Sequence, residues 1–319
     1  MTDQIATVSV VIPTAGRPEF LAEALRSVRA LEGPDIDLDP IVIDDGADDK
    51  TELVAHAHGA RYIRTTSHGA AAARNAGLRA ASGEFIAFLD DDDSWLPGHI
   101  RPHIRAMRRR PEVGAVFGQV VSYDYALQEH TRPWPDPFPA GPTSFARVFA
   151  YQPQIGATVI RAAVVDRVGF FDELLLGDED WDWQLRVALA HEVEFLSVPC
   201  VAYRCRPDGQ RETDDIEWMR LPYFDRVYWR NVRRAASARP SWMQVARGFV
   251  RVRGRYAAGF LSSAIAHSKD GDHKAARRQL VRGFRASPLH ACLWLTREAA
   301  ARSALLHAVA SSSAVRSRP

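Results

Sequence analysis

Cysteine is scarce in this chain, and the three cysteines match neither a disulfide nor a metal-binding pattern. Cys200, Cys205 and Cys292 follow no metal-ligand spacing within the 319 residues. Cys205 lies five positions after Cys200 on an expected strand, and this odd offset points their side chains to opposite faces of the sheet. We therefore expect no disulfide between them and predict a reducing compartment.

Long apolar segments are also missing. No apolar run approaches the roughly 18 residues of a membrane-spanning helix. The first residues lack the basic segment and apolar stretch of a signal peptide. We therefore predict a cytoplasmic protein, with a peripheral position at the inner face of the cell membrane as the alternative. We expect no nucleic-acid partner.

Neither sign of charge dominates the whole chain, but the two signs are unevenly distributed. Lysine and arginine total 41 and aspartate and glutamate total 39, which gives a net charge of +2. The acids concentrate before residue 217, whereas the segment from Arg220 onward is rich in arginine. A basic segment of this kind fits contact with an acidic lipid or protein, a homo-oligomer interface or a solvated helix face.

Strand-like and helix-like segments alternate over the first two thirds of the chain. Short β-branched runs are followed by apolar residues with helical spacing, for example Phe20, Leu21, Leu25 and Val28 after Pro18. This alternation predicts an α/β fold with a doubly wound, mostly parallel sheet and helices on both faces. The expected strands are 7–12, 41–43, 61–64, 85–89, 113–123, 155–160 and 193–203. The expected helices begin near residues 18, 51, 70, 98, 162 and 180.

The last third of the chain is predicted to be helical. We divide the chain into an α/β domain over residues 1–212, an all-helical C-terminal region over residues 213–310 and a disordered tail over residues 311–319. Within the helical region, residues 257–286 predict two short antiparallel helices that are joined at residues 269–272.

Residues 84–97 contain the most informative pattern in the chain. An apolar run that is long enough for a buried strand ends in four consecutive aspartates, residues 90–93. Ligands bind at the carboxyl ends of the strands in parallel sheets, and four adjacent carboxylates repel one another unless a counter-charge is present. All-oxygen ligands suit Mg²⁺ or Mn²⁺. The alternative interpretation is a solvated acidic turn.

Two other acidic segments are candidates for the same site. Asp44 and Asp45 end an expected strand, where a carboxylate can accept a hydrogen bond from a nucleobase or ribose, or can simply form a turn. Residues 177–186 place acids and tryptophans together at a helix start. An aspartate there can take a proton from an attacking hydroxyl, and a tryptophan offers a flat surface to a sugar ring. The alternative is a helix cap with buried aromatic residues.

Five motifs in this order resemble those of the inverting family 2 nucleotide-sugar glycosyltransferases, which have the GT-A fold. The resemblance covers about residues 7–205 and implies a GT-A-like catalytic domain. It also implies transfer of a sugar from a nucleoside-diphosphate sugar, in the first place a UDP-sugar, to a hydroxyl acceptor in glycan or glycoconjugate synthesis. The motifs are Val8–Thr14, Ile43–Gly46, Ala73–Gly77, Phe88–Pro97 and Glu179–Asp182.

The resemblance implies roles for the acids at the end of the expected strand at 85–89. Asp92, together with Asp90 and Asp93, is expected to hold Mn²⁺ or Mg²⁺ against the donor diphosphate, where a cation neutralises the charge of the leaving group. Asp91 is expected to face the ribose. The residues expected to bind the nucleotide-sugar are Pro13, Thr14, Arg17, Asp45, Arg74, Asp90 and Asp91.

The resemblance also implies roles at the helix start near residue 180. Asp180 is expected to deprotonate the acceptor hydroxyl, with Glu179 and Asp182 as support. Trp181 is expected to contact the acceptor, which is a glycan or a lipid-linked molecule. One base, one metal-assisted leaving group and no enzyme nucleophile together predict inversion of configuration at the transferred sugar.

Two other functions share parts of this pattern. A catalytically silent assembly protein that binds nucleotide-sugars or glycans would keep the fold, but the presence of both Asp92 and Asp180 argues against it. A sugar nucleotidyltransferase would need a glycine-rich phosphate loop after the first strand, and residues 15–17 are too short to form one. The sequence does not indicate the donor sugar, the acceptor or the role of the helical region.

Overall fold

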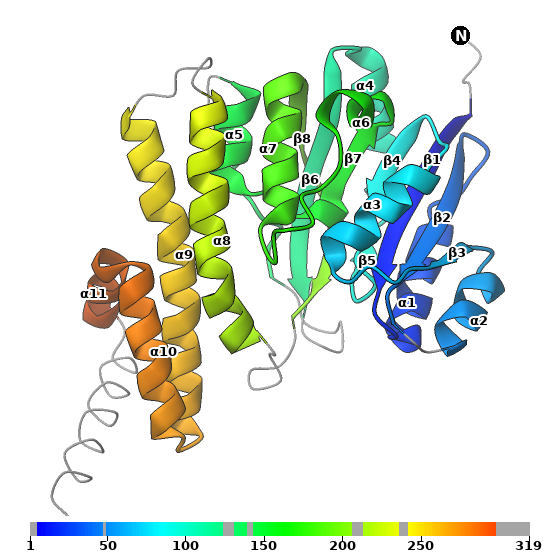
Figure 1. Cartoon of the computed structure of the whole chain (residues 1–319). Helices are drawn as coiled ribbons and strands as arrows, with labels where there is room; N and C mark the ends of the chain where they lie inside the picture. Colours follow the sequence, from blue (N-terminus) through cyan, green and yellow to red (C-terminus); the bar gives the residue numbers. More distant parts are fainter. Residues whose placement is uncertain are drawn as a thin grey trace, which may run out of the picture. The chain divides into compact units, whose positions relative to one another are not determined.

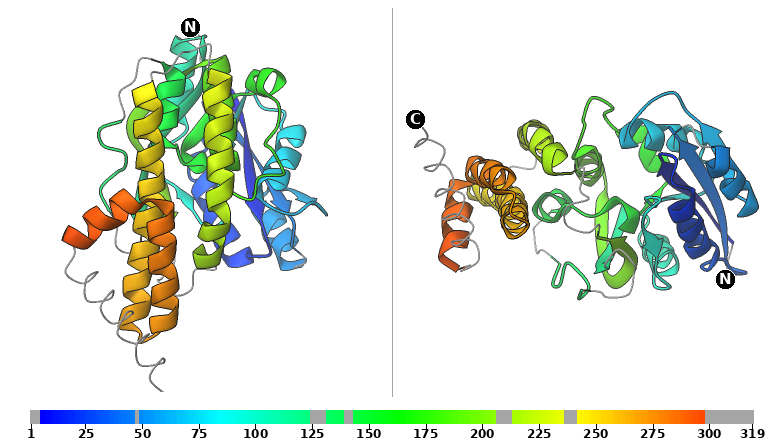
Figure 2. Two further views of the ribbon diagram at one scale, coloured as in Figure 1. Left: turned by 60° about the vertical axis from the view of Figure 1, so that its left-hand side comes forward. Right: turned by 90° about the horizontal axis from the view of Figure 1, so that it is seen from below.

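The computed structural model describes residues 5–46, 49–123, 131–138, 143–205, 213–235 and 242–297. The chain divides into two compact units between residues 205 and 206 (Figures 1 and 2). We had placed the domain boundary after residue 212, and residues 206–212 lie outside the described ranges, as does the predicted tail 311–319. Each unit is therefore treated by itself.

The described part of the first unit forms an eight-stranded mixed sheet in the spatial order β3, β2, β1, β4, β7, β6, β8 and β5. The first four of these are mutually parallel, and β6 is parallel to β8. β7 is antiparallel to both neighbours, and β5 is antiparallel to β8. The predicted doubly wound, mostly parallel sheet is confirmed. The strands are β1 (Ala6–Thr14), β2 (Ile36–Asp44), β3 (Arg61–Arg64), β4 (Phe85–Phe88), β5 (Ser94–Trp95), β6 (Val113–Tyr123), β7 (Thr158–Arg161) and β8 (Glu192–Arg204).

The strand order places a topological switch point between β1 and β4. After β1 the chain forms β2 and β3 on one side, and it then returns to form β4 on the other side of β1. The connections that follow β1 and β4 therefore lead away from each other at the carboxyl edge of the sheet, which is where open α/β sheets bind ligands. The four-aspartate run follows β4 at this edge.

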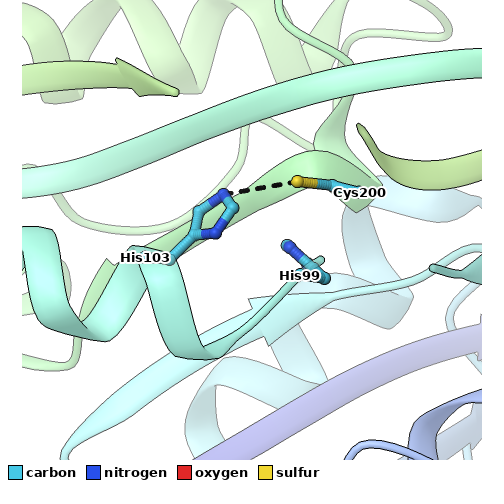
Figure 3. A group of neighbouring side chains, drawn as sticks. All are labelled: His99, His103 and Cys200. Atoms are coloured by element: carbon cyan, nitrogen blue, oxygen red, sulfur yellow. Dashed lines mark hydrogen bonds between the residues drawn. The ribbon is translucent and has the colours of Figure 1, made fainter. Parts of the chain in front are cut away.

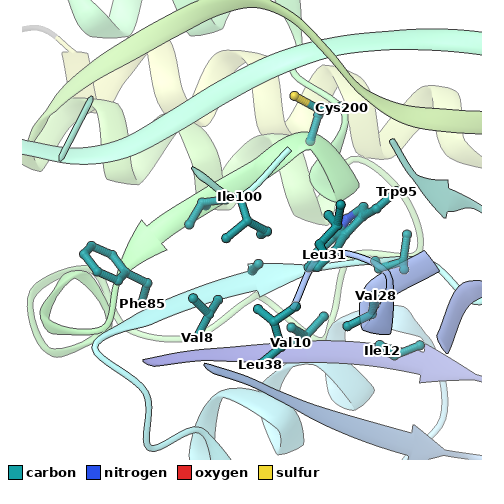
Figure 4. Close-up of a cluster of buried hydrophobic side chains, with 14 of the residues drawn as sticks. Val8, Val10, Ile12, Val28, Leu31, Leu38, Phe85, Trp95, Ile100 and Cys200 are labelled. Carbon is teal, nitrogen blue, oxygen red and sulfur yellow. The ribbon is translucent and has the colours of Figure 1, made fainter. Parts of the chain in front are cut away.

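Helices cover both faces of the sheet, as predicted. The alternation of β1 directs Val10 and Ile12 into a core with Val28 (Figure 4) and Val11 to the opposite face. There Gly77 comes so close that a Cβ atom would collide with the Val11 side chain. The helices of this unit are α1 (Pro18–Arg29), α2 (Asp49–Ala57), α3 (Ala70–Ala80), α4 (Arg101–Arg109), α5 (Ser144–Tyr151), the 3₁₀-helix η1 (Ile155–Ala157), α6 (Ala163–Val168) and α7 (Glu179–Ala190).

Three local features differ from the predicted pattern. Helix α5 was not predicted, and residues 155–157, which we expected to begin a strand, form η1 ahead of β7. Strand β5 was also missed, because two residues are too few to show the alternation of a strand. It exists because Ser94 and Trp95 pair with β8.

The second unit is helical in its described residues, as predicted, and consists there of α8 (Thr213–Arg234), α9 (Trp242–Lys269), α10 (His273–Ala286) and α11 (Pro288–Arg297). The predicted junction at 269–272 is confirmed, because Asp272 caps α10 by accepting a 2.9 Å hydrogen bond from the Ala275 N–H. The prediction of a short first helix was wrong, since α9 has 28 residues. Within the described ranges, no helix is long and apolar enough to cross a membrane.

Candidate active site

The acidic run is held against the end of β1. Leu89 N–H donates to the Val11 carbonyl at 3.1 Å, so the pairing of the two strands continues to the residue before the first aspartate. Thr14, the last residue of β1, donates its hydroxyl to Asp91 Oδ2 at 2.5 Å. Pro13 lies in β1 opposite Ile43 of β2. The predicted neighbours of the donor site therefore share one edge of the sheet.

Arg17, the residue before α1, is the counter-charge of two aspartates of the run. Its guanidinium binds both oxygens of Asp91, with Nε 3.1 Å from Oδ2, and its Nη1 lies 2.9 Å from Asp92 Oδ2. Asp91 is 1% exposed, and burial raises the pKa of its carboxyl to about 6 against the opposing effect of Arg17. The predicted ribose contact of Asp91 is wrong for this structure, because the side chain is covered by Arg17 and Thr14.

Arg74 joins the acidic run to the start of α7. Its Nη2 donates to Asp90 Oδ1 at 2.9 Å and its Nη1 to Glu179 Oε1 at 2.8 Å, although these residues lie 16 and 105 positions away in the sequence. Burial by itself would lower the pKa of the Arg74 guanidinium, but the charges of Asp90, Glu179 and Asp180 outweigh that effect and raise the pKa. A single buried cation therefore connects three of the predicted motifs.

Asp180 lies in the first turn of α7, next to this network, and is partly exposed. Burial raises the pKa of its carboxyl to about 7, with a further contribution from the charge of Glu179, while Arg74 opposes the change. A carboxyl group with a pKa near neutrality can take up a proton during a reaction and release it afterwards, which is the requirement for a general base.

Asp93 is buried and is not available to a metal ion. One of its oxygens accepts the Arg204 backbone N–H at 3.0 Å, and the other accepts Gln154 Nε2 at 3.1 Å. Desolvation and the charge of Asp90 raise the pKa of this carboxyl well above its ordinary value. The prediction of Asp93 as a metal ligand therefore does not fit. Asp93 instead anchors the acidic loop to the end of β8.

Trp181 and Asp182 are also buried. Trp181 is 1% exposed and donates its indole N–H to the Val148 carbonyl at 3.2 Å. The predicted acceptor contact of Trp181 is wrong, because its ring presents almost no surface. Asp182 is fully buried and forms a 3.1 Å ion pair with Arg186, so it stabilises α7 and does not support the base as predicted.

The two acids at the end of β2, Asp44 and Asp45, differ in solvent exposure. Asp44 is fully buried and accepts hydrogen bonds from Gly46 N–H at 2.8 Å and from the Tyr62 hydroxyl at 2.9 Å. Asp45 is partly exposed and accepts the Gly69 N–H at 2.9 Å. Its predicted contact with the nucleobase stays a prediction, and its accessibility is compatible with that role.

The carboxylates of Asp90 and Asp92 are the members of the run that solvent can reach. Their side chains are 29% and 22% exposed, and each forms an ion pair with an arginine. Carboxylate oxygens on an accessible loop are suitable ligands for Mn²⁺ or Mg²⁺. These two residues therefore fit a divalent cation, whereas the two buried aspartates beside them do not.

Residues that support the site were missed at the sequence level. Arg204 donates Nε–H to the Asp92 carbonyl at 3.0 Å in addition to its contact with Asp93. Asn75, the neighbour of Arg74, binds the backbone of Phe171 on both sides, with distances of 2.8 and 3.0 Å, and so holds the segment that leads to α7. Asn75 had a signal at the sequence level, because it lies in one of the predicted motifs.

An acidic loop at the switch point of a mostly parallel sheet, with helices on both faces, defines an α/β enzyme of the GT-A type. The family model described as "Glycosyl transferase family 2" matches residues 9–168. The chain belongs to this family and is a glycosyltransferase.

Curated relatives carry the same assignment. The uncharacterized glycosyltransferase YwdF of Bacillus subtilis is 28% identical over 232 residues, which cover 69% of this chain and 82% of YwdF. Glycosyltransferase AglE of Haloferax volcanii is 27% identical over 230 residues, which cover 66% of this chain and 71% of AglE.

Solved structures share the fold at low sequence identity. TarS of S. aureus has a TM-score of 0.58 at 16% identity over 95% of this chain, but the match spans about half (54%) of the TarS chain. A shorter form, TarS 1–349, has been solved with UDP-GlcNAc and has a TM-score of 0.51 at 15% identity over 88% of this chain and 91% of its own. The mannosyltransferase PcManGT of Pyrobaculum calidifontis, solved with GDP-Man and Mn²⁺, has a TM-score of 0.54 at 15% identity and covers 96% of this chain and 88% of its own.

Proposed function

We propose that this chain is a metal-dependent, inverting glycosyltransferase that moves a sugar from a nucleoside-diphosphate sugar, with a UDP-sugar favoured, to a hydroxyl of a glycan or lipid-linked acceptor. The observation that carries the proposal is the position of Arg74, which holds the acidic run and the start of α7 together. The ligands of the structural neighbours TarS 1–349 and PcManGT support a nucleotide-sugar donor, and the Mn²⁺ in the latter supports a divalent cation.

On the donor side, the site offers carboxylates for a divalent cation and an arginine for the diphosphate that the cation accompanies. Asp92 and Asp90 are the residues that would hold Mn²⁺ or Mg²⁺, and the cation when bound neutralises charge on the departing diphosphate. Arg17 is 32% exposed beside Asp92, so its fork of donors can exchange an aspartate oxygen for a phosphate oxygen. Asp45 is placed to contact the nucleobase, while Arg74 positions the acids.

On the acceptor side, Asp180 takes the proton of the acceptor hydroxyl as that oxygen attacks the anomeric carbon. The new C–O bond forms on the face opposite the diphosphate while the old bond to the diphosphate oxygen breaks. The electron pair of the old bond leaves with the nucleoside diphosphate. No enzyme nucleophile takes part, so the configuration at the anomeric carbon is inverted. Glu179 raises the pKa of Asp180 and thereby keeps it sufficiently basic.

The basic face of α10 supports contact with an acidic membrane, where a lipid-linked acceptor would be located. The helix contains no acidic residue. It buries a stripe of residues that includes Ala276 and Leu280, and exposes cations on the other side. A cationic helix face of this type is attracted to anionic headgroups. A shallow surface hollow on this face is lined by Lys274, Arg277, Arg278, Val281, Arg282 and Arg285.

A panel of nucleotide-sugars tests the proposal. We expect one donor to release its nucleoside diphosphate in the presence of Mn²⁺ or Mg²⁺. The release should be faster with an acceptor present than by hydrolysis alone, and it should stop after EDTA treatment. A silent assembly protein would bind a donor in a thermal-shift screen and release no nucleoside diphosphate with any cation. A sugar nucleotidyltransferase would instead produce pyrophosphate from a sugar phosphate and a nucleoside triphosphate. Either of these two results would contradict the proposal.

A further inference from the structure

Three side chains with metal-binding atoms converge in the first unit, behind the acidic loop. His99 lies two residues before α4, His103 lies in α4, and Cys200 lies in β8 (Figure 3). One ligand atom from each residue lies within 4.8 Å of the other two, and His103 Nε2 is 3.9 Å from Cys200 Sγ. All three residues are at most 1% exposed. None of them takes part in the site described above.

The polar atoms of this cluster are poorly satisfied. Three ring nitrogens, both of His99 and Nδ1 of His103, make no hydrogen bond of normal geometry within the described residues. Each buried polar group of this kind costs about 1–3 kcal/mol. Ring packing holds His99 in place instead, because its ring meets Trp95 edge to face at 4.7 Å and His103 at 4.6 Å. A metal ion takes one nitrogen from each ring, so it would remove this cost for one nitrogen of His99, while the His103 nitrogen that faces Cys200 is Nε2.

The protonation states of the two imidazoles suit a metal ion. Burial, with a further contribution from the charge of His103, lowers the pKa of His99 well below its ordinary value against an opposing backbone interaction at Gly156. Burial likewise lowers the pKa of His103 to about 3 against one at Ala157. Both imidazoles are therefore neutral and keep a lone pair at neutral pH, which is the form that binds metals. Burial raises the pKa of the Cys200 thiol to about 12, so a metal ion would have to displace its proton, which is a cost of binding.

We propose that His99, His103 and Cys200 form a structural site for a thiophilic transition-metal ion, in the first place Zn²⁺. Zinc takes nitrogen at about 2.0–2.1 Å and thiolate at about 2.3 Å in a tetrahedron, so its ligand atoms lie about 3.3–3.6 Å apart. The ligand atoms, which lie within 4.8 Å of one another, therefore need to approach by up to about 1.5 Å. On binding, the Cys200 Sγ–H bond breaks and its proton passes to solvent, while the thiolate keeps the electron pair. A water molecule or backbone carbonyl would complete the tetrahedron.

The ligand chemistry distinguishes this site from the acidic loop. Imidazole and thiolate select zinc and other soft or borderline ions, whereas the carboxylates of Asp90 and Asp92 suit Mn²⁺ or Mg²⁺. The spacing of the cysteines predicted no metal site, because Cys200 lies 97 residues from His103 and only the fold brings them together.

The position of the site gives it a mechanical role. Leu96 N–H donates to the Cys200 carbonyl at 2.8 Å, and Ser94 pairs with Ala202, so residues 94–96 are joined to β8 from Cys200 to Ala202. Arg204, which anchors Asp93, follows on the same strand. A metal ion that joins α4 to β8 would therefore brace the acidic loop from behind.

Cobalt substitution of the full-length protein tests the proposal. Because the cluster is buried, the metal is supplied during folding, by expression in cobalt- or zinc-supplemented minimal medium. We expect about one equivalent of zinc to remain after gel filtration in EDTA, by elemental analysis. The cobalt protein should show a thiolate-to-cobalt charge-transfer band in the near ultraviolet. Cobalt on the acidic loop, where the ligands are oxygens, would give no such band.

Matched cysteine variants assign the band. Cys200→Ser should lose the band and the retained zinc, while Cys292→Ser, whose side chain is exposed on α11, should keep both. His99→Gln provides a second variant in case Cys200→Ser does not fold, and should also lose the retained zinc. Wild-type protein without retained zinc and without a charge-transfer band would overturn the proposal. So would a band that persists in Cys200→Ser.

Discussion

The two units of this chain use charge in opposite ways. In the first unit, Arg74 is buried between carboxylates that come from distant parts of the sequence, and Arg17 and Arg204 contact the same acidic loop. In the second unit, the cations of α10 lie on an exposed face around Val281. Buried charges are costly and depend on their partners. Exposed charges act through a field that salt screens. The first arrangement suits the reaction site that we propose, and the second suits a reversible surface contact.

The largest effect is expected at Asp180. Asp180→Asn removes the base but leaves the acidic loop in place, so turnover should fall by about two to four orders of magnitude. Metal-dependent binding of the donor should remain close to that of the wild type. Steady-state rates and calorimetric donor titration measure the two quantities. Asp178→Asn is the matched control, because Asp178 raises the pKa of Asp180 only through its charge. If Asp180→Asn kept full activity, the neighbouring Glu179 would become the candidate base.

Removal of Arg74 tests whether the buried network depends on its central cation. Arg74→Met leaves Asp90 and Glu179 without their partner, and the free energy of unfolding should fall by about 3–5 kcal/mol, the usual range for a broken buried ion pair. Arg64→Met removes a cation whose side chain is 46% exposed, and should change stability far less, because solvent screens an exposed ion pair. Urea denaturation measures both. Equal losses of unfolding free energy in the two variants would show that burial does not make Arg74 more important for stability than Arg64.

Asp92 and Asp93 allow the metal role to be separated from the structural role. Asp92→Ala should abolish the gain in nucleoside-diphosphate affinity that Mn²⁺ or Mg²⁺ produces, as measured by calorimetry. Asp93→Asn should lower the melting temperature, because it disturbs the contacts to Arg204 and Gln154, and should preserve that gain. If Asp92→Ala bound the nucleotide with unchanged metal dependence, its assignment as a ligand would be refuted.

The pH dependence of catalysis should report the pKa of Asp180. A base must be deprotonated to act, so kcat/KM should fall as the pH drops below about 7. Glu179→Gln removes a negative neighbour and leaves Arg74 with one fewer carboxylate. Both changes lower the pKa of Asp180, so the fall of kcat/KM on the acidic side of the pH profile should move to lower pH. If the fall of kcat/KM moved to higher pH in Glu179→Gln, the effect of Glu179 on the pKa of Asp180 would be contradicted.

The smallest effect on turnover is expected from the exposed charges of the second unit. Arg277→Glu combined with Arg278→Glu should weaken co-sedimentation of the full-length protein with phosphatidylserine vesicles, and added salt should weaken wild-type binding in the same direction. Transfer to a water-soluble acceptor should not change. Arg79→Glu combined with Arg105→Glu, two exposed positions of the first unit, changes the net charge by the same amount and is the control. Unaltered vesicle binding in the double variant would exclude α10 as the membrane contact.

The sequence predicted the sheet well because its signals are local. The apolar run that leads into residues 90–93 identified β4, and the alternation of strand and helix identified the doubly wound order. The acids at 90–93 and 179–182 indicated the site for the same reason. The helical character of the second unit was also visible from composition and spacing.

The individual roles could not be read in the same way, because they depend on contacts between distant residues. Nothing local shows that Asp93 binds Gln154, 61 residues away, or that Trp181 reaches the Val148 carbonyl. The sequence therefore assigned Asp93 to the metal together with Asp90 and Asp92, although the fold buries Asp93 and leaves only Asp90 and Asp92 partly exposed. The His99, His103 and Cys200 cluster was missed because a strand far along the chain supplies its sulfur.

The configuration of the product tests the central claim most directly. If Asp180 activates the acceptor hydroxyl, that oxygen attacks the anomeric carbon on the face opposite the departing diphosphate. The sugar is then transferred in a single displacement. NMR analysis of the new glycosidic bond, made with an α-linked donor, should then show a β-linkage. A product that retains the α-configuration would require an enzyme nucleophile or front-face attack, and would contradict the assignment of Asp180.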